Sequence, residues 1–172
     1  MEEVVIRVVK GSMAVKKSNK EIKVKPLLFD SYLAAVRNSV GTRMFRNFYA
    51  RINRKKEDVT IDGIRSCAFF VSTILTMFGL TKSVHLTLAK VIKDMEESGW
   101  YKIKKPRVGA VLIWEREKMS GKWFGHVGFY VGGDMAISNS TSVRTPQRHH
   151  WTFDNKRGIK AIYWHRKLQE GK

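Results

Sequence analysis

The chain has 172 residues, of which 43% are hydrophobic, and its 33 Lys and Arg residues outnumber 15 Asp and Glu residues to give a formal net charge of +18. This length suits one domain with a buried core and is short for two, and the hydrophobic content excludes a disordered basic tail. One cysteine excludes an intrachain disulfide. The charge favours an anionic partner, a class that includes nucleic acid, an acidic wall polymer and an anionic membrane surface.

No stretch of the sequence reaches the ~18 apolar residues that cross a bilayer, so we predict no membrane span. The N-terminus also lacks a basic region followed by an apolar run, so no export signal is predicted. Localisation therefore stays open between the cytoplasm, a phage-encoded lytic protein and export with a signal that has been removed.

Residues 1–26 form a strongly basic N-terminal arm. Two runs of alternating residues, Val4–Val9 and Glu21–Lys25, indicate short strands or an ordered, solvated arm. Residues 1–12 are either native or a cloning tag, and we assign them no function. The folded domain is expected over residues 27–172.

The first helix of the domain is predicted over Leu27–Asn38, where apolar residues keep helical spacing and Gly41 provides a stop signal. Residues 42–63 mix aromatic residues with the charged stretch Arg51–Asp58, a combination that indicates a long loop with a short hairpin. The basic residues of this loop either contact phosphates or carboxylates or solvate an exposed face.

The central predicted helix covers Arg65–Gly79 and holds the single cysteine, Cys67, in its first turn. Its apolar residues fall at helical spacing, which predicts a buried helix, and Ser66 is placed to cap it. Unpaired N–H groups and the positive end of the helix dipole favour the thiolate form of Cys67, as a nucleophile requires. The alternative is that Cys67 is a small hydrophobic residue of the core.

A further amphipathic helix is predicted from Val84 to Met95, with His85 beside its apolar face as a core or surface residue. From Gly109 onward the hydrophobic period becomes two, which predicts strands over 108–114, 124–131, 135–139 and 159–164. Helices followed by a contiguous antiparallel sheet define the α+β class. We therefore expect N-terminal helices packed on a C-terminal antiparallel sheet of four or more strands.

The dipeptide Gly132-Gly133 suits a two-residue hairpin turn between the strands that contain His126 and Asn139. In the register that this turn implies, His126 lies directly opposite Asn139, and directly opposed side chains share a face. An amide in that position fixes the orientation and tautomer of a histidine that acts as a general base. A three-residue loop instead places Ser140 opposite His126, and Ser138 is the weaker candidate because strand alternation points it to the other face.

A cysteine at a helix N-terminus, a histidine at the start of a strand and a polar residue on the next strand follow the logic of papain-like catalysis. Three blocks of the sequence resemble the NlpC family of cysteine peptidases and, more loosely, the related CHAP amidases. They are Ser66-Cys67-Ala68-Phe69-Phe70-Val71, the strand Val108–Trp114 and Gly125-His126-Val127-Gly128-Phe129-Tyr130-Val131. The resemblance covers about residues 27–140 and is most specific around His126.

The resemblance implies a papain-like fold in which Cys67 is the nucleophile and His126 the general base, with the third polar position near Ser138 or Asn139. The hairpin register favours Asn139. The residues expected to bind substrate are Arg43, Tyr49 and Trp114.

The chain departs from the family pattern next to the expected substrate cleft. Ser66 stands where the family usually has Asp, Ala68-Phe69 replaces Ser-Gly, and Ala110 replaces the Asp of a Gly-Asp strand. Arg43 falls within a segment that looks like the Gly-Thr-Pro-Tyr segment of the family, so its tyrosine is missing or moved to Tyr49. These departures bear on specificity.

The implied reaction is hydrolysis of an amide or peptide bond, with peptidoglycan stem peptides as the expected substrate and without a metal or cofactor. Two alternatives stay open: a non-catalytic basic module that binds nucleic acid, and a cysteine amidase or acyltransferase with another substrate. A C-terminal cluster is a further candidate for binding an acidic substrate or orienting His126, although its spacing does not match structural zinc sites. It comprises Arg144, Arg148, His149, His150, Trp151 and His165.

Overall fold

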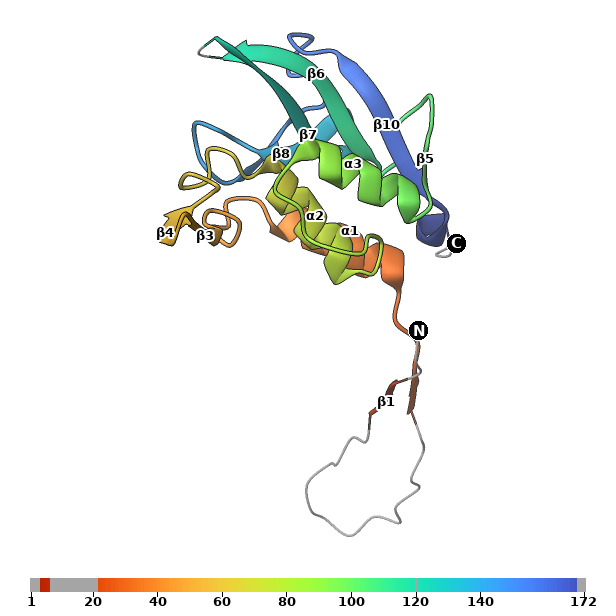
Figure 1. The fold of residues 1–172 in the computed structure, drawn as a ribbon. Helices are drawn as coiled ribbons and strands as arrows, with labels where there is room; N and C mark the ends of the chain where they lie inside the picture. The colour runs from red at the N-terminus through yellow and green to blue at the C-terminus, as the bar shows by residue number, and fades with distance from the viewer. Residues whose placement is uncertain (1–3, 7–21, 120, 170–172) are drawn as a thin grey trace.

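The computed structural model describes residues 4–6, 22–119 and 121–169, and a six-stranded antiparallel sheet forms its centre (Figure 1). The strand order across the sheet is β5-β10-β6-β7-β8-β9. The strands are β5 (Trp100–Lys102), β6 (Val111–Met119), β7 (Lys122–Gly132), β8 (Met135–Asn139), β9 (Pro146–His150) and β10 (Ile159–His165).

Three α-helices and two small sheets accompany this sheet in the described part of the chain. The helices α1 and α2 lie below the sheet in Figure 1, and α3 crosses in front of it. The α+β class predicted from the sequence is therefore confirmed. The elements are α1 (Leu28–Asn38), α2 (Cys67–Met77), α3 (Leu88–Glu97), the 3₁₀ helix η1 (Arg166–Gln169), the strand pair β1 (Val4–Ile6) and β2 (Ile22–Val24), and the hairpin β3 (Tyr49–Ile52) and β4 (Lys55–Asp58).

The helix α2 is central because its side chains are apolar on nearly every face, as the sequence predicted. Phe70, Val71 and Leu75 are fully buried. The ring of Phe70 meets that of Phe129 on β7 at 5.4 Å between centroids, edge to face. Burying a side chain of this size stabilises the fold by about 1.5–3 kcal/mol, so these contacts hold the start of α2 against β7.

The helix α1 is fixed to the same strand by one aromatic side chain. Tyr32 is fully buried, its ring lies 5.8 Å from that of Phe129, and its hydroxyl donates a 2.8 Å hydrogen bond to the carbonyl of Gly109. Gly109 has φ +91°, and a Cβ there would lie 3.2 Å from the rings of Phe29 and Tyr32. Only glycine combines this backbone conformation with such close packing.

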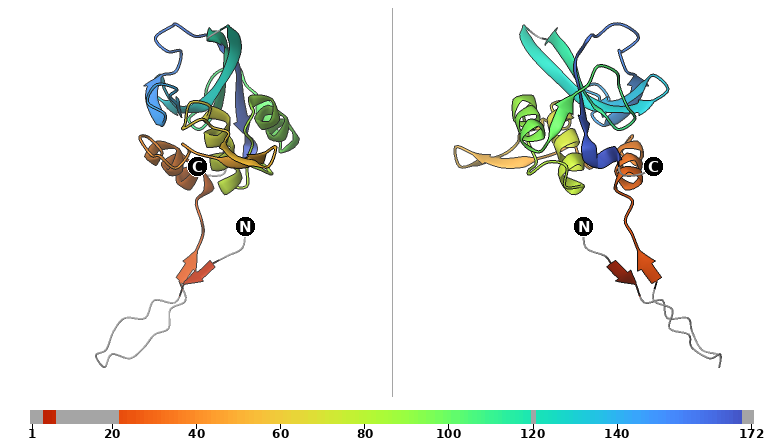
Figure 2. Two further views of the ribbon diagram at one scale, coloured as in Figure 1. Left: turned by 60° about the vertical axis from the view of Figure 1, so that its left-hand side comes forward. Right: turned by 90° about the vertical axis from the view of Figure 1, so that its right-hand side faces the viewer.

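Most predicted elements are present, with shifted ends. The loop over 42–63 contains the β3–β4 hairpin, which projects from the body in the right-hand view of Figure 2. The predicted helix over Val84–Met95 begins only at Leu88, so His85 lies in the preceding loop. The arm forms the short pair β1 and β2, and residues 7–21 of its predicted runs lie outside the described residues.

Two strands of the sheet were not predicted. The strand β5 has three residues, too few to show the alternation of apolar and polar residues that is typical of a strand. The strand β9 begins with Pro146 and is mostly polar. Both lie at the edges of the sheet, where proline and short strands are tolerated. Among the described residues, no helix combines the length and apolar character needed to span a bilayer.

Candidate active site

A cleft of about 1300 Å³ opens where the N-terminus of α2 meets the strands β7 and β8. Cys67, His126 and Ser138 line it together, with the loops before α3 and β10 forming its walls. Residues far apart in the sequence therefore meet in one solvent-accessible space. The sequence predicted that Cys67 and His126 act in one site, and both residues line this cleft.

Cys67 is the first residue of α2 and keeps part of its surface exposed toward the cleft. Burial raises the pKa of its thiol, and the backbone N–H groups of Ala68 and Val127 and the charge of Arg157 oppose that effect without overcoming it. The N–H groups at the helix end act in the direction that the sequence predicted, but burial outweighs them.

The predicted cap of α2 was also wrong. Ser66 occupies the N-cap position, but its hydroxyl makes no capping hydrogen bond and finds no partner among the described residues. The backbone N–H of Phe70 bonds the carbonyl of Ser66 at 2.8 Å, which begins the helix. The N–H groups of the first three helical residues have no intrahelical acceptor, so they point toward the cleft end of α2.

His126 lies on β7 next to the fully buried ring of Trp114, with 5.2 Å between ring centroids. Burial, the charge of Arg157 and the nearby His149 lower the pKa of His126 to about 3. At neutral pH its imidazole is therefore uncharged and one ring nitrogen carries a lone pair.

Three side chains on three adjacent strands form a hydrogen-bonded chain, which we call the cleft triad. Ser138 Oγ lies 2.8 Å from Nε2 of His126 and 2.8 Å from Nε2 of His149. Nδ1 of His149 lies 2.8 Å from the carbonyl oxygen of His150. The strand β9, which brings His149 to Ser138, was not predicted.

The carbonyl of His150 determines the direction of every bond in the cleft triad. A carbonyl only accepts, so Nδ1 of His149 donates to it, and burial lowers the pKa of His149 and keeps it neutral, with Nε2 as an acceptor. Ser138 then donates to His149 and accepts from Nε2–H of His126. By elimination the lone pair of His126 resides on Nδ1, the nitrogen that Ser138 does not occupy.

The favoured register between β7 and β8, with Asn139 opposite His126, was wrong, and the observed pairs continue the alternative register that sets Ser140 opposite His126. Gly128 pairs with Ser138 and Phe129 with Ile137. A bulge after Tyr130 interrupts the regular pairing between these residues and the turn at Gly132-Gly133. This register shifts β8 by one residue and turns Ser138 toward His126. Asn139 consequently points to the opposite face and does not contact His126.

Asn139 instead supports the loop that leads into Cys67. Its Nδ2 donates a 2.7 Å hydrogen bond to the carbonyl of Gly63, and the side chain is buried. Gly63 has φ +87°, and a Cβ there would lie 2.6 Å from the carbonyl oxygen of Arg144.

Ion pairs hold the same loop from its other side. The neighbouring Asp62 is paired with both Arg46 and Arg144, at 2.6 Å each. The loop before the thiol is thus fixed from both sides.

The predicted substrate-binding residues are only partly brought together. Trp114 lines the cleft, although its Nε1–H is committed to the carbonyl of Trp151 at 2.7 Å and its ring acts as a wall. Tyr49 and Arg43 do not line the cleft. Tyr49 is exposed on the β3–β4 hairpin, with Lys56 Nζ 4.5 Å above its ring.

The C-terminal histidines divide between the site and the scaffold. His149 joins the cleft triad, whereas Nε2 of His165 lies 2.9 Å from the carbonyl of Ser98 at the C-terminal end of α3, outside the cleft. Within the described residues, no group of three or more His, Cys, Asp or Glu side chains is placed to hold a metal ion.

Arg157 is a cleft residue that sequence reasoning missed, because no periodic element or motif surrounds it. Its guanidinium is 14% exposed, and its charge acts on both Cys67 and His126. Comparison with models of known protein families and with curated protein sequences finds no match to this chain. The geometry of the cleft is therefore the basis for a functional assignment.

Proposed function

We propose that this chain is a papain-like cysteine hydrolase that cleaves amide bonds, with Cys67 as the nucleophile and His126 as the general base. One observation carries the proposal. The cleft triad leaves the lone pair of His126 on Nδ1, in the same cleft as a thiol at the N-terminus of α2. A neutral imidazole with a defined tautomer beside a nucleophile is what acyl transfer requires.

The reaction follows from these groups. The sulfur of Cys67 attacks the amide carbonyl carbon while its proton moves to Nδ1 of His126, and the oxyanion accepts hydrogen bonds from N–H groups at the start of α2. The imidazolium then gives this proton to the leaving amine, and a thioester remains. A water molecule loses a proton to His126, attacks the thioester and releases the acid and the free thiol.

The remaining members of the cleft triad support the charged intermediate. When Nδ1 accepts a proton, Nε2–H of His126 already donates to Ser138, and the hydroxyl of Ser138 donates to His149. No second proton has to move. Ser138 and His149 are therefore positioning residues that hold the ring and its tautomer.

Peptidoglycan stem peptides are the substrate class that we propose for this activity. The family resemblance of the sequence around Cys67 and His126 suggests it, and a net charge of +18 suits an anionic cell wall. Incubation with purified stem peptides should release free amines in proportion to enzyme and time, and Cys67→Ala should abolish that release while keeping the fold.

A second measurement tests the nucleophile without a choice of substrate. Iodoacetamide should alkylate Cys67 at neutral pH, and His126→Gln should slow this labelling at least about tenfold, because no general base then accepts the thiol proton. His85→Gln is the matched control, because His85 bonds Asp94 outside the cleft and should leave the rate unchanged. Equal rates in all three proteins would overturn the assignment of Cys67 and His126.

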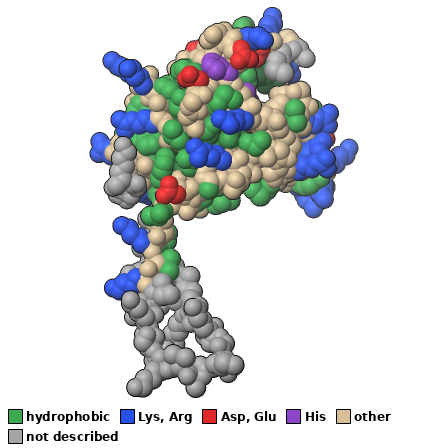
Figure 3. Space-filling model, turned by 180° about the vertical axis from the view of Figure 1, so that it is seen from behind, with side chains coloured by type: hydrophobic (Ala, Val, Ile, Leu, Met, Phe, Trp, Pro, Cys, Tyr) green, Lys and Arg blue, Asp and Glu red, His purple; other side chains and the backbone are tan. Residues whose placement is uncertain are grey.

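A second candidate function is binding of nucleic acid, and the β3–β4 hairpin favours it. Arg51, Arg54, Lys55 and Lys56 are exposed there, and none of them forms an ion pair with a described residue. Figure 3 shows Lys and Arg side chains gathered at the edge of the molecule where this hairpin projects. This candidate predicts salt-sensitive binding of DNA or RNA that survives Cys67→Ala and weakens in a hairpin variant.

A further inference from the structure

We propose that the cleft selects an amide substrate with an anionic group, a carboxylate or a phosphate, which Arg157 binds beside the reacting carbonyl. This inference rests on the proposed hydrolase and specifies the chemistry of its substrate. Three features of the described residues support it: the bonding of the guanidinium, its position relative to the thiol and the charges of the cleft wall.

The guanidinium of Arg157 is held by two uncharged acceptors and pairs with one exposed carboxylate. Its Nε donates to the carbonyl of Glu115 at 2.9 Å and its Nη2 to the carbonyl of Phe124 at 3.0 Å, and both acceptors are uncharged. The one carboxylate nearby belongs to Glu117, which is 60% exposed and lies 3.4 Å from Nη1. Because arginine has five N–H donors, the head group keeps donors available for an anion in a fixed orientation.

The charge of Arg157 is directed at the reaction centre. Arg157 lines the same cleft as Cys67 and His126, and its charge acts to lower the pKa of both groups. A substrate whose anionic group binds Arg157 would therefore have its amide bond held next to the thiol. Such an anion would also offset the repulsion between Arg157 and the imidazolium that forms during the reaction.

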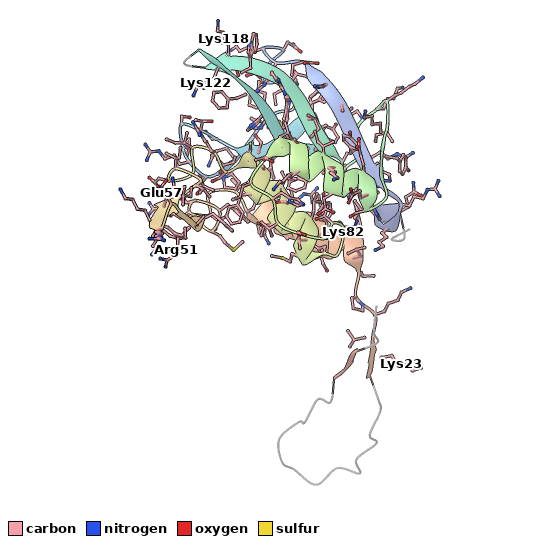
Figure 4. The ribbon with its side chains drawn as sticks, viewed as in Figure 1. Lys23, Arg51, Glu57, Lys82, Lys118 and Lys122 are labelled. Atoms are coloured by element: carbon pink, nitrogen blue, oxygen red, sulfur yellow. The ribbon has the colours of Figure 1, made fainter. Side chains whose placement is uncertain are left out.

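The wall of the cleft is also positively charged. Arg65, Arg116, Lys122 and Lys160 line it, whereas Glu117 is its one acidic residue. Figure 4 shows Lys122 near the tip of the β6–β7 hairpin, at the top of the molecule. Leu88, Phe124 and the 62% exposed Trp123 supply apolar surface between the charges. A ligand with an anionic group on an apolar stem fits this combination.

Two alkylating reagents of nearly the same size test the inference. Iodoacetate carries a carboxylate and iodoacetamide a neutral amide, and a thiolate in solution repels the charged reagent. If Arg157 binds an anion beside Cys67, iodoacetate should label Cys67 faster relative to iodoacetamide than it labels glutathione. High salt should lower this ratio of rates, because screening weakens the attraction.

Variants test whether residues of the cleft cause the preference for iodoacetate over iodoacetamide. Arg157→Gln should lower the ratio at least about fivefold, whereas Arg51→Gln removes the same charge from the β3–β4 hairpin and should leave it unchanged. Since Arg157 also bonds two carbonyls, the double variant Lys122→Gln/Lys160→Gln provides a second test at exposed side chains. It should lower the ratio without affecting the fold.

Competition distinguishes the two anion classes. Protection of Cys67 by glutarate beyond that by chloride at equal ionic strength supports a carboxylate, and protection by inorganic phosphate supports a phosphate. A glutathione-like ratio with no protection by either anion overturns the inference, even while fast, His126-dependent labelling by iodoacetamide upholds the hydrolase. Slow labelling by both reagents, independent of His126, overturns the hydrolase itself.

Discussion

Two histidine clusters lie at opposite ends of α3, and they differ in how completely their polar groups are paired. In the Asp94 cluster, the carboxylate of Asp94 accepts hydrogen bonds from the backbone N–H groups of Lys82 and Ser83 and from the side chains of His85 and Ser98. In the cleft, the imidazole of His126 has one hydrogen-bond partner among the described residues, Ser138 at Nε2, and Nδ1 is the nitrogen that we propose as the base.

The difference separates a histidine that holds the fold from one that can react. Burial alone would raise the pKa of Asp94, but its hydrogen bonds lower it, so the carboxylate stays charged and ties the 82–85 loop to α3. Near the cleft, Ser66 Oγ and Asn139 Oδ1 are buried and find no partner among the described residues. Unpaired groups cost stability, and their position around the thiol is typical of a functional site.

The largest expected effect comes from removing the carboxylate of the Asp94 cluster. Asp94→Ala should lower the free energy of unfolding by about 3 kcal/mol, because four hydrogen bonds lose their acceptor and the side chain is 6% exposed. Urea denaturation measures this loss. The alkylation rate of Cys67 should stay unchanged in the folded variant. A change below about 1 kcal/mol would remove the distinction between the two clusters.

The cleft triad should show the opposite pattern. Ser138→Ala should slow alkylation of Cys67 by up to about tenfold and no more than His126→Gln does, since His126 loses the bond that fixes its tautomer. The control is Ser140→Ala, whose hydroxyl bonds Ser142 and the N–H of Val143 at the surface. Pseudo-first-order labelling followed by mass spectrometry measures both. Equal rates would show that Ser138 does not position His126.

The pH dependence of stability tests whether the histidine of the cleft is neutral in the folded protein. His126 has a pKa of about 3 in the folded protein against 6.5 when unfolded, so between these values the unfolded chain binds more protons. The free energy of unfolding should therefore fall as pH decreases below about 6.5, with a contribution from His126 of about 1.4 kcal/mol per pH unit. In His126→Gln this slope should become shallower, because the contribution of His126 is lost. It should not disappear, because burial also lowers the pKa of His149 and His165. An unchanged slope would contradict a neutral His126.

The sequence predicted the parts of this site that depend on local pattern. The helix that begins at Cys67 and the strand that holds His126 follow from hydrophobic period, and their order along the chain follows from the topology of an α+β domain. The paired loop around Gly63 and the role of Asn139 within it depend on contacts between distant segments. Such contacts leave no periodic signal.

The residue that hydrogen-bonds His126 was not predicted correctly from the sequence. Strand alternation is sensitive to a single residue, and the bulge after Tyr130 moved Ser138, not Asn139, onto the face of His126. His149 was singled out as a candidate to orient His126, but its link through Ser138 requires the unpredicted edge strand β9. Arg157 lies in an irregular loop, so only the fold reveals its proximity to the thiol.

The smallest expected effect concerns the starts of the helices α2 and α3. At α3, the hydroxyl of Thr87 accepts a hydrogen bond from the N–H of Lys90 at 3.4 Å, whereas at α2 the hydroxyl of Ser66 caps nothing. Thr87→Ala should therefore lower the free energy of unfolding by about 0.5–1 kcal/mol, and Ser66→Ala should leave it unchanged within about 0.5 kcal/mol.

Urea denaturation of the two variants against the parent protein measures this difference. A loss in Ser66→Ala as large as that in Thr87→Ala would show that Ser66 caps α2 after all, and the N–H groups beside Cys67 would then be partly occupied. An unchanged stability leaves those groups uncommitted. In the proposed reaction they would donate to the oxyanion of the tetrahedral intermediate, because the helix that they begin starts at the thiol in the cleft.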